Sequence, residues 1–225
     1  PNREEGVERT GTRWMSALGA GLASAGLLAA AAHAAPVAIS TLPPGAINNV
    51  QAQAVAKVIQ ENSDLQMRVV TFNSPAAIMG AAQNKQAEFA FTSNDEAGVA
   101  LRGQDEHEGK PMSDLRVAAS LFPFKVGVAV RADSDIKTVA DLKGKRIATG
   151  WQGFKQCVPL FNAMLATEGL SLEDGEAVPA TNLLRAADDF KAGKTDAFIF
   201  AVGAPKVAEI DSSVGGIRFL PLNDS

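Results

Sequence analysis

The sequence has little of the chemistry on which most enzymes and metal centres rely. It contains no tyrosine, one cysteine and two histidines among its 225 residues. A single cysteine excludes an internal disulfide and a cysteine-based zinc site, and two histidines exclude a histidine-rich metal site. The GxSxG, HExxH and P-loop motifs are also missing from the sequence. We therefore expect no catalytic residues, no metal site and no cofactor.

The net charge of the chain argues against a nucleic-acid partner. The chain carries 21 basic and 25 acidic residues, a net charge of −4, and its pI is about 5.3. Such a chain has no basic field over the whole domain, so we expect no nucleic-acid partner. With 46% apolar and 20% charged residues the composition is that of a globular protein, which excludes wholesale disorder and collagen-like repeats.

The amino-terminal segment is the longest uncharged stretch. Residues 14–34 carry no charge, are rich in alanine and glycine, and end in Ala32-His33-Ala34 before Pro36. Small residues at that spacing are typical of the site that signal peptidase cleaves. The sequence therefore predicts a signal peptide region over residues 1–34, cleavage after Ala34 and a periplasmic mature protein. An uncleaved membrane anchor is the alternative.

Apolar runs and amphipathic stretches alternate along the rest of the chain. One amphipathic stretch is predicted to bury Val50, Ala54, Val58 and Ile59. Thr138 is predicted to cap a short helix that ends at Gly144. The alternation predicts α/β layers with largely parallel sheets. The predicted strands span residues 37–41, 67–72, 89–92, 115–121, 126–131, 146–149, 177–179, 197–201 and 217–220.

In such sheets ligands bind where strands end and helices begin, because the free N–H groups of the helices point there. Small polar residues and glycines stand at these points, and together they would hold a small carboxylate or amide. Each residue alone could equally cap a helix or shape a turn. The predicted ligand-binding residues are Asn48, Asn49, Asn73, Ser74, Thr92, Ser93, Asn94, Asp95, Gly150, Trp151, Gln152, Gly153, Phe154, Lys155, Asn182 and Gly203.

Several of these side chains permit two interpretations. Trp151 could form the wall of a pocket or lie in the core, and Lys155 could meet an anionic ligand or remain solvated. Asp95 could bind a ligand ammonium group, but a helix cap is the simpler role. Outside the predicted site, Cys157 is expected in the core, and His107, in an acidic loop, is expected at the surface.

Four segments resemble the TAXI family of TRAP-transporter substrate-binding proteins. The longest is LRVAASLFPFKVGVAVRADSDIKTVADLKGKRIATG at residues 115–150, and the others are EFAFTSNDEA at 88–97, AADDFKAGKTDA at 186–197 and AVGAP at 201–205. The first loop departs from the family pattern, because TLPPGAINNV at residues 41–50 contains no aromatic residue. The resemblance implies a type II periplasmic-binding-protein fold, in which two α/β lobes enclose a ligand cleft.

The resemblance also implies an organisation and a function. Lobe I would span residues 35–132 and lobe II residues 133–222, and lobe I would be incomplete without a carboxyl-terminal return that family members have. The protein would capture a small organic acid or amino acid by hinge closure and deliver it to the membrane subunits of a TRAP transporter. Two other functions are the alternatives to transport. The protein could be an enzyme on the same fold, or it could be the sensing domain of a membrane receptor.

Overall fold

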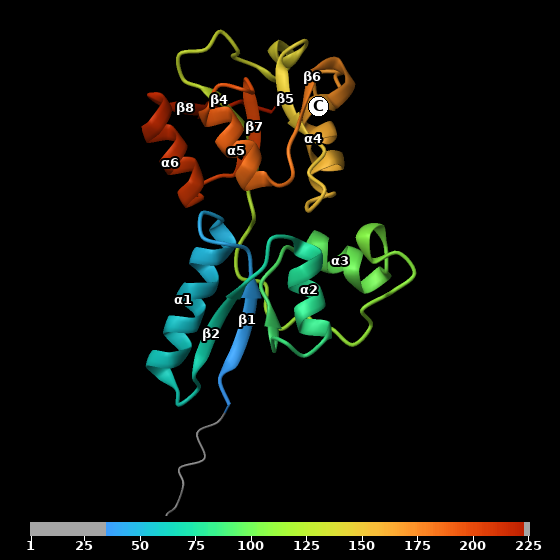
Figure 1. Ribbon diagram of the computed structural model, residues 1–225, viewed down its shortest axis with the longest axis vertical. Coiled ribbons are helices and arrows are strands. Elements are labelled where there is room, and N and C mark those ends of the chain that lie inside the picture. The colour runs from blue at the N-terminus through green and yellow to red at the C-terminus, as the bar shows by residue number, and fades with distance from the viewer. Residues whose placement is uncertain (1–34, 223–225) are drawn as a thin grey trace, which may run out of the picture. The chain divides into compact units, whose positions relative to one another are not determined.

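The computed structural model describes residues 35–222, which contain two β-sheets (Figure 1). The predicted signal peptide, residues 1–34, lies outside the described residues. Both sheets belong to one unit of the chain. Among residues 35–222 no helix is both long and apolar enough to cross a membrane.

The first sheet has three parallel strands in the order β2-β1-β3. They are β1 (Val37–Thr41), β2 (Met67–Thr71) and β3 (Phe89–Ala90), and the helices are α1 (Ile47–Asn62), α2 (Pro75–Gln83) and α3 (Asn94–Arg102). Alternate residues of β1 point to opposite faces. Ile39 packs against α1 and Ala38 packs on the side of α2, so these helices cover the two faces of β1 (Figure 1).

Helix α1 buries a different face from the predicted one. It packs on the sheet through Ala52 and Ala56, and Ile59 is partly buried against the same core, whereas Val50 and Val58 are 49% and 57% exposed. Ala54, also on the predicted face, is exposed as well, because the prediction placed the centre of the buried face at the wrong angle around the helix. A helix that lies close to a strand instead presents its smallest side chains to it, because interiors are close-packed.

The second sheet has five strands in the order β6-β5-β7-β4-β8. They are β4 (Val126–Arg131), β5 (Arg146–Thr149), β6 (Glu176–Pro179), β7 (Ala197–Ala201) and β8 (Ile217–Phe219). Strand β4 runs antiparallel to both β7 and β8, while β5 runs parallel to β6 and β7. The second sheet is therefore mixed. It also takes in β4, which lies on the lobe I side of the boundary predicted at residue 132.

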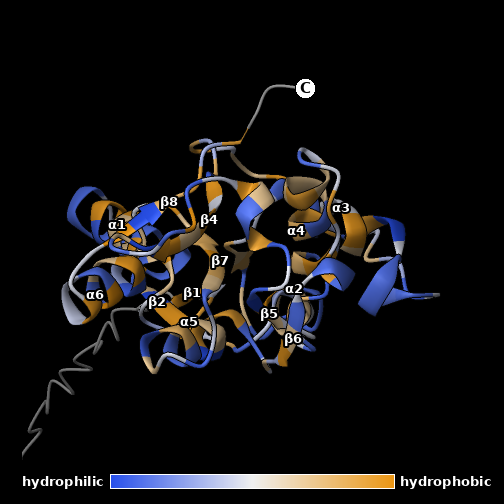
Figure 2. Ribbon diagram, turned by 90° about the horizontal axis from the view of Figure 1, so that it is seen from above, coloured by the Kyte–Doolittle hydropathy of each residue, from blue (hydrophilic) through white to orange (hydrophobic). Residues whose placement is uncertain are grey.

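Three helices cover the second sheet, and the main core lies between them and its strands. They are α4 (Cys157–Ala166), α5 (Leu183–Lys191) and α6 (Pro205–Val214), and α6, like α1, carries both hydrophilic and hydrophobic residues (Figure 2). Val128 and Val130 pack towards α4 with Phe161, whereas Phe198 packs towards α5 with Phe190. Pro159 lies in the first turn of α4, the one place in a helix where its missing N–H costs nothing.

Short 3-10 segments connect these elements: η1 (Asp105–His107), η2 (Val139–Leu142) and η3 (Leu172–Asp174). The start predicted for η2 is confirmed, because Thr138 and Asp141 form a capping box. The prediction for His107 is wrong, since this residue is only 7% exposed. Backbone hydrogen bonds from His107 N to Gln104 O and from Lys110 N to His107 O hold it within a tight turn, which the polar sequence around it does not indicate.

The strand predicted at residues 115–121 is absent from the described structure. The segment is irregular, and Val117 and Leu121 are 73% and 55% exposed. An apolar run becomes a strand only beside a partner strand, and β3, at the edge of the first sheet, is two residues long. Just beyond the run, the ring of Phe122 stacks on Phe91 at 6.3 Å.

Candidate functional site

Loops that follow the strands of the two sheets come into contact. The backbone N–H of Lys206, at the start of α6, donates to Gly45 O in the loop after β1 at 3.1 Å. Leu42, in the same loop, packs against the core of the second sheet. Beyond β5, a Cβ built on Gly153 would lie 3.5 Å from both Asn73 O and the Ser74 Cβ. The predicted meeting of loops is therefore present for the segments after β1, β2 and β5.

Thr41 is an unsatisfied polar residue at the end of β1. It is fully buried, and its Oγ1 has no hydrogen-bond partner within residues 35–222. Because Ile39 faces α1 and side chains alternate along a strand, Thr41 lies on the α1 face of the sheet. A buried hydroxyl without a partner costs free energy. A bound molecule with a polar atom at this position would remove that cost.

The amino terminus of α1 is open. Its N-cap residue, Ala46, has no side chain that could accept a hydrogen bond, and the N–H groups of Ile47 and Asn48 have no acceptor among the described residues. Asn48 is 7% exposed, and the Asn49 amide donates to Leu42 O at 2.9 Å. Free N–H groups and the helix dipole favour an anionic group at such a terminus.

The loop after β5 contributes two further unsatisfied atoms. Trp151 Nε1 and Gln156 Oε1 are both buried without a partner in the described structure. Gly150 has φ +89°, a conformation that glycine adopts without strain. The Trp151 side chain is fully buried and packs on Phe161 with ring centroids 6.0 Å apart. Of its two interpretations, core packing is what the structure shows, and contact with a ligand stays a prediction.

Three predicted ligand-binding residues cap helices. The Ser74 hydroxyl accepts from Ala77 N at 3.2 Å at the start of α2, and the Asn182 side chain accepts from Arg185 N at 2.9 Å at the start of α5. Ser93 forms a capping box with Glu96 at the start of α3. The helix cap predicted at Asp95 is therefore wrong by two residues. A ligand role for the capping residues stays a prediction.

The other predicted residues differ in exposure. Phe154 is buried in the core around Trp151, and Thr92 donates a short hydrogen bond to Glu96. The backbone N–H of Gly153 donates to Thr181 O at 3.3 Å. The exposed members of the predicted set are Asn73, Asn94, Asp95, Gly150, Gln152, Lys155 and Gly203.

Two ionisable side chains near this region have shifted pKa values. Burial raises the pKa of Glu96, although hydrogen bonds from Thr92 and Ser93 oppose the shift. Burial, with the charges of Glu96 and Glu106, raises the pKa of Cys157 to about 12. The Cys157 thiol is thus protonated at neutral pH and is a core residue, as predicted. No group of three or more metal-binding side chains occurs in the described part of the chain.

The sequence patterns missed three residues of this site: Thr41, Gln51 and Gln156. Each has a buried side-chain oxygen that lacks a partner within residues 35–222. Thr41 belongs to a predicted strand, and its place as the last residue of that strand was the one signal that could have identified it. Gln156 follows the predicted Lys155, and Gln51 stands two positions after the predicted Asn49, but the sequence around them does not indicate that their side-chain oxygens are buried.

The chain belongs to the NMT1-like family, which matches residues 43–225. Membership of the TAXI subfamily, which the sequence segments suggested, is not decided by this match.

Among solved structures, the fold is similar to that of periplasmic solute-binding proteins. The alkanesulfonate-binding protein SsuA from Xanthomonas axonopodis pv. citri, bound to MOPS, is 22% identical with a TM-score of 0.54; the match covers 87% of this chain and 63% of that protein. An ancestral arginine-binding protein bound to arginine is 14% identical, with a TM-score of 0.55 and coverage of 82% and 78%. The aliphatic sulphonate binding protein SsuA from Escherichia coli is 20% identical, with a TM-score of 0.51 and coverage of 82% and 56%.

These likenesses define the fold as the predicted two-lobed α/β fold of periplasmic binding proteins. The chain spans less than two thirds of the length of the two SsuA proteins.

Proposed function

We propose that the protein is an extracytoplasmic solute receptor that binds a small organic acid or amino acid between its two sheets. The observation that carries the proposal is Thr41, a fully buried residue whose Oγ1 lacks a partner among the described residues and which lies on the α1 face at the end of β1. The fold, shared with proteins that bind alkanesulfonates and arginine, supports a binding role over a catalytic one. We therefore propose no enzymatic activity.

The polar groups at the site favour a ligand with an anionic end. The N–H groups of Ile47 and Asn48, at the start of α1, would donate to a carboxylate, and the Thr41 hydroxyl can donate or accept. On the side of the second sheet, Trp151 Nε1 is a donor and Gln156 Oε1 an acceptor. An amino acid, with an ammonium group beside its carboxylate, would use both kinds of partner.

Binding would proceed by closure of the two lobes. A ligand that contacts loops from both sheets gains its full set of interactions only when those loops meet, so it shifts the protein towards the closed state. In the structure the loop after β1 already contacts α6 through Gly45 and Lys206. The loop after β5 lies near the loop after β2, so that a side chain added at Gly153 would touch Ser74.

The test begins with the small molecules that purify with the protein. Native mass spectrometry of the chain, followed by analysis of the released molecules, is expected to identify a small carboxylate or amino acid. Adding that compound to the stripped protein should raise its melting temperature, because a ligand that binds only the folded state stabilises it. Conversion of the compound to a product would replace this proposal with the enzyme alternative.

We further propose that the receptor is exported to the periplasm and serves a TRAP-type transporter. The support is the uncharged segment before Ala35 and the resemblance of residues 115–150 to TAXI proteins. Amino-terminal sequencing of periplasmic protein should begin at Ala35. Uptake by membrane vesicles that contain TRAP subunits should require the added receptor. Uptake that depends on another class of transporter would contradict the TRAP assignment while leaving the binding role intact.

A further inference from the structure

One stretch of the described chain joins the first sheet to the second (Figure 1). The strands and helices of the first sheet lie within residues 37–102, and those of the second within residues 126–219. The loop after α3 stays with the first sheet, because Met112 N donates to Ala100 O at 2.9 Å. Within residues 35–222 the two lobes are therefore joined covalently only through residues 115–125, the tether.

The tether is held by few contacts. Its residues 116–124 are all exposed and form no helix or strand. In the described part of the chain their backbone N–H and C=O groups make no hydrogen bond with another protein group. A segment whose backbone is bonded only to water changes its dihedral angles at little cost. The tether can therefore bend while both sheets keep their own hydrogen bonds.

Phe122 anchors the tether to the first sheet. Its ring stacks on that of Phe91, with centroids 6.3 Å apart and an angle of 24° between the planes, a geometry in which aromatic rings attract. Phe91 in turn packs against the core that contains Ile39 and Ala52. The chain bends at Phe122. This residue therefore moves with the first sheet.

Lys125 is the point at which the tether joins the second sheet. Its carbonyl oxygen accepts from Val202 N at 2.9 Å, and the next residue, Val126, is already paired with β7. Between the anchored ring of Phe122 and the anchored backbone of Lys125 only residues 123–124 remain free.

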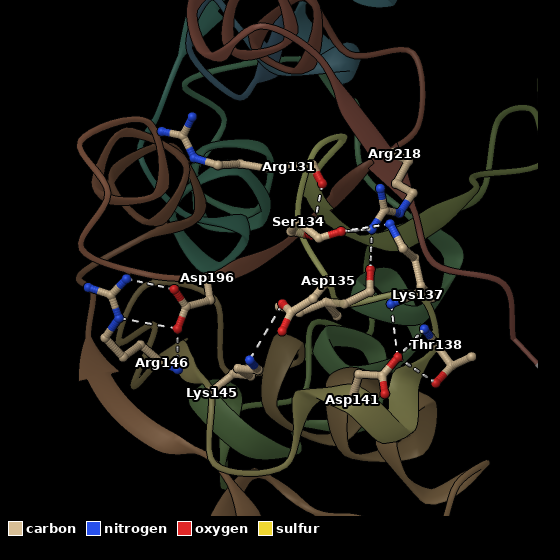
Figure 3. A network of polar contacts seen from close by, with 11 residues as sticks. Arg131, Ser134, Asp135, Lys137, Thr138, Asp141, Lys145, Arg146, Asp196 and Arg218 are labelled. Atoms are coloured by element: carbon tan, nitrogen blue, oxygen red, sulfur yellow. Dashed lines mark hydrogen bonds and ion pairs between the residues drawn. The ribbon is translucent and has the colours of Figure 1, made fainter.

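Side-chain contacts brace the second sheet, so it moves as a unit. Arg218, in β8, donates to the carbonyl oxygens of Ser134 and Ile136 beyond the end of β4 (Figure 3). The Arg146 side chain, in β5, donates to Asp196, just before β7, at 3.2 and 2.6 Å. These contacts tie four strands together. A rotation of one lobe against the other therefore acts on the tether and not on the sheet.

Pro123 limits how the free part of the tether can turn. The proline ring fixes its own φ, and it also keeps the preceding residue, Phe122, out of the helical conformation. The soft dihedral angles between the two anchors are then ψ of Pro123 and both φ and ψ of Phe124. A hinge made of so few dihedral angles gives the rotation a defined axis.

We propose that Pro123 and Phe124 are the pivot about which the two lobes close, and that the ring contact of Phe122 with Phe91 fixes its position. The inference rests on the proposed closure of the lobes around a solute, and it adds where the rotation occurs. Upstream of Phe122 the next bonded backbone group is Leu115 N, which donates to Met112 O. Without the ring contact the free part would therefore extend over residues 116–124, and the rotation would lose its fixed axis.

The test measures the distance between the lobes in the full chain without any solute. Spin labels are attached to Gln60→Cys in α1 and to Lys143→Cys between η2 and β5, both exposed positions. The native Cys157 is buried, which raises its pKa to about 12, so its thiol does not react with the label at neutral pH. Double electron–electron resonance then gives the distribution of label distances.

Phe122→Ala should widen this distribution about twofold. The free part grows from residues 123–124 to residues 116–124, and the spread of a flexible chain increases as the square root of its length. Phe122→Tyr keeps the ring and should keep the parent width. Phe124→Ala is the matched control: it removes the same side chain at a position that makes no ring contact in the described structure, and should leave the width nearly unchanged.

Pro123→Gly tests the pivot without touching the ring contact. It should also widen the distribution, because glycine has the least restricted backbone. An unchanged width in either Phe122→Ala or Pro123→Gly would overturn the pivot, and so would equal widening by Phe122→Ala and Phe124→Ala. Those outcomes leave solute binding intact. Conversely, purified protein that carries no carboxylate or amino acid would contradict the receptor role and leave the measured pivot in place.

Discussion

The backbone of Gly45 and that of Lys206 are joined by a hydrogen bond of 3.1 Å between the loop after β1 and the start of α6. The carbonyl oxygen of Gly45 accepts this bond. The φ of Gly45 is +101°, a conformation that residues with a Cβ rarely adopt. This one contact therefore couples the first sheet to the helix layer of the second. It also makes the link depend on the absence of a side chain at residue 45.

Gly45→Ala should destabilise the protein by about 1–2 kcal/mol, because an L-residue is strained at that φ, and the new Cβ would lie 3.3 Å from Leu184 Cδ2. Chemical denaturation measures the change. Gly80→Ala is the matched control: it lies within α2 with nothing within 4 Å of the added Cβ, and should stabilise by about 1 kcal/mol. Equal effects of the two substitutions would contradict the strain argument.

Thr41→Val should have opposite effects on stability and on binding. Removing a buried hydroxyl that lacks a partner within residues 35–222 should stabilise the ligand-free protein by about 1 kcal/mol. The same change should weaken binding of the co-purified ligand about tenfold, through loss of one hydrogen bond. Thr71→Val, at the paired and exposed position of β2, should alter neither quantity. Loss of stability in Thr41→Val would show that the hydroxyl has a structural role.

Gly153 should tolerate a small side chain and reject a large one. Its built Cβ lies at ordinary contact distance, 3.5 Å, from Asn73 O and the Ser74 Cβ, so Gly153→Ala should change the stability by less than about 0.5 kcal/mol. Gly153→Leu would push the facing loops apart and should weaken ligand binding much more than it lowers the melting temperature. Calorimetric titration and thermal melts of both variants make the comparison. Equal affinity in the two variants would separate this loop from the binding site.

Trp151→Ala should unfold the second sheet more readily. The ring is fully buried against Phe161, so its truncation should cost about 3–5 kcal/mol. Trp151→Phe keeps most of the volume, removes the unpartnered indole N–H, and should cost clearly less. If the Nε1 group donates to the ligand, Trp151→Phe should still weaken binding. Normal affinity in this variant would leave Trp151 as a core residue alone.

Glu96 should make the protein less stable as the pH rises. Burial raises its pKa above the usual 4.5, so the native state holds a proton that the unfolded state has already released. The stabilisation that this bound proton gives the native state is therefore complete below pH 4.5. It is lost as the pH rises through the higher pKa of Glu96 in the native state.

Glu96→Gln should remove this slope while keeping an acceptor oxygen for Thr92 and for Ser93 N. The melting temperature of Glu96→Gln relative to the parent should increase between pH 4.5 and 7. Glu108→Gln, at an exposed residue, is the control and should show no such trend. A constant difference between the Glu96→Gln variant and the parent would contradict the raised pKa.

The local patterns of the sequence predicted most strands and helices. The turn at Gly150, the apolar run of β4 and the buried Cys157 all follow from short-range chemistry, and each lies where that chemistry predicts. Turn residues and alternating apolar residues act within a few positions of one another, so they can be interpreted without knowing the fold. The α/β class followed from the order of these elements, whereas the two lobes were implied by the family resemblance of residues 115–150.

The tertiary structure alone decided which polar atoms lack partners. Thr41 looks like an ordinary strand residue in the sequence, but the packing of distant segments buries its hydroxyl without a hydrogen-bond partner among residues 35–222. The tertiary structure also decided two other features that the sequence did not predict. His107 is buried within a tight turn, and the apolar run at Val117 is exposed and irregular. The burial of these residues depends on contacts between segments far apart in the chain, and the pattern of their own neighbours in sequence does not indicate those contacts.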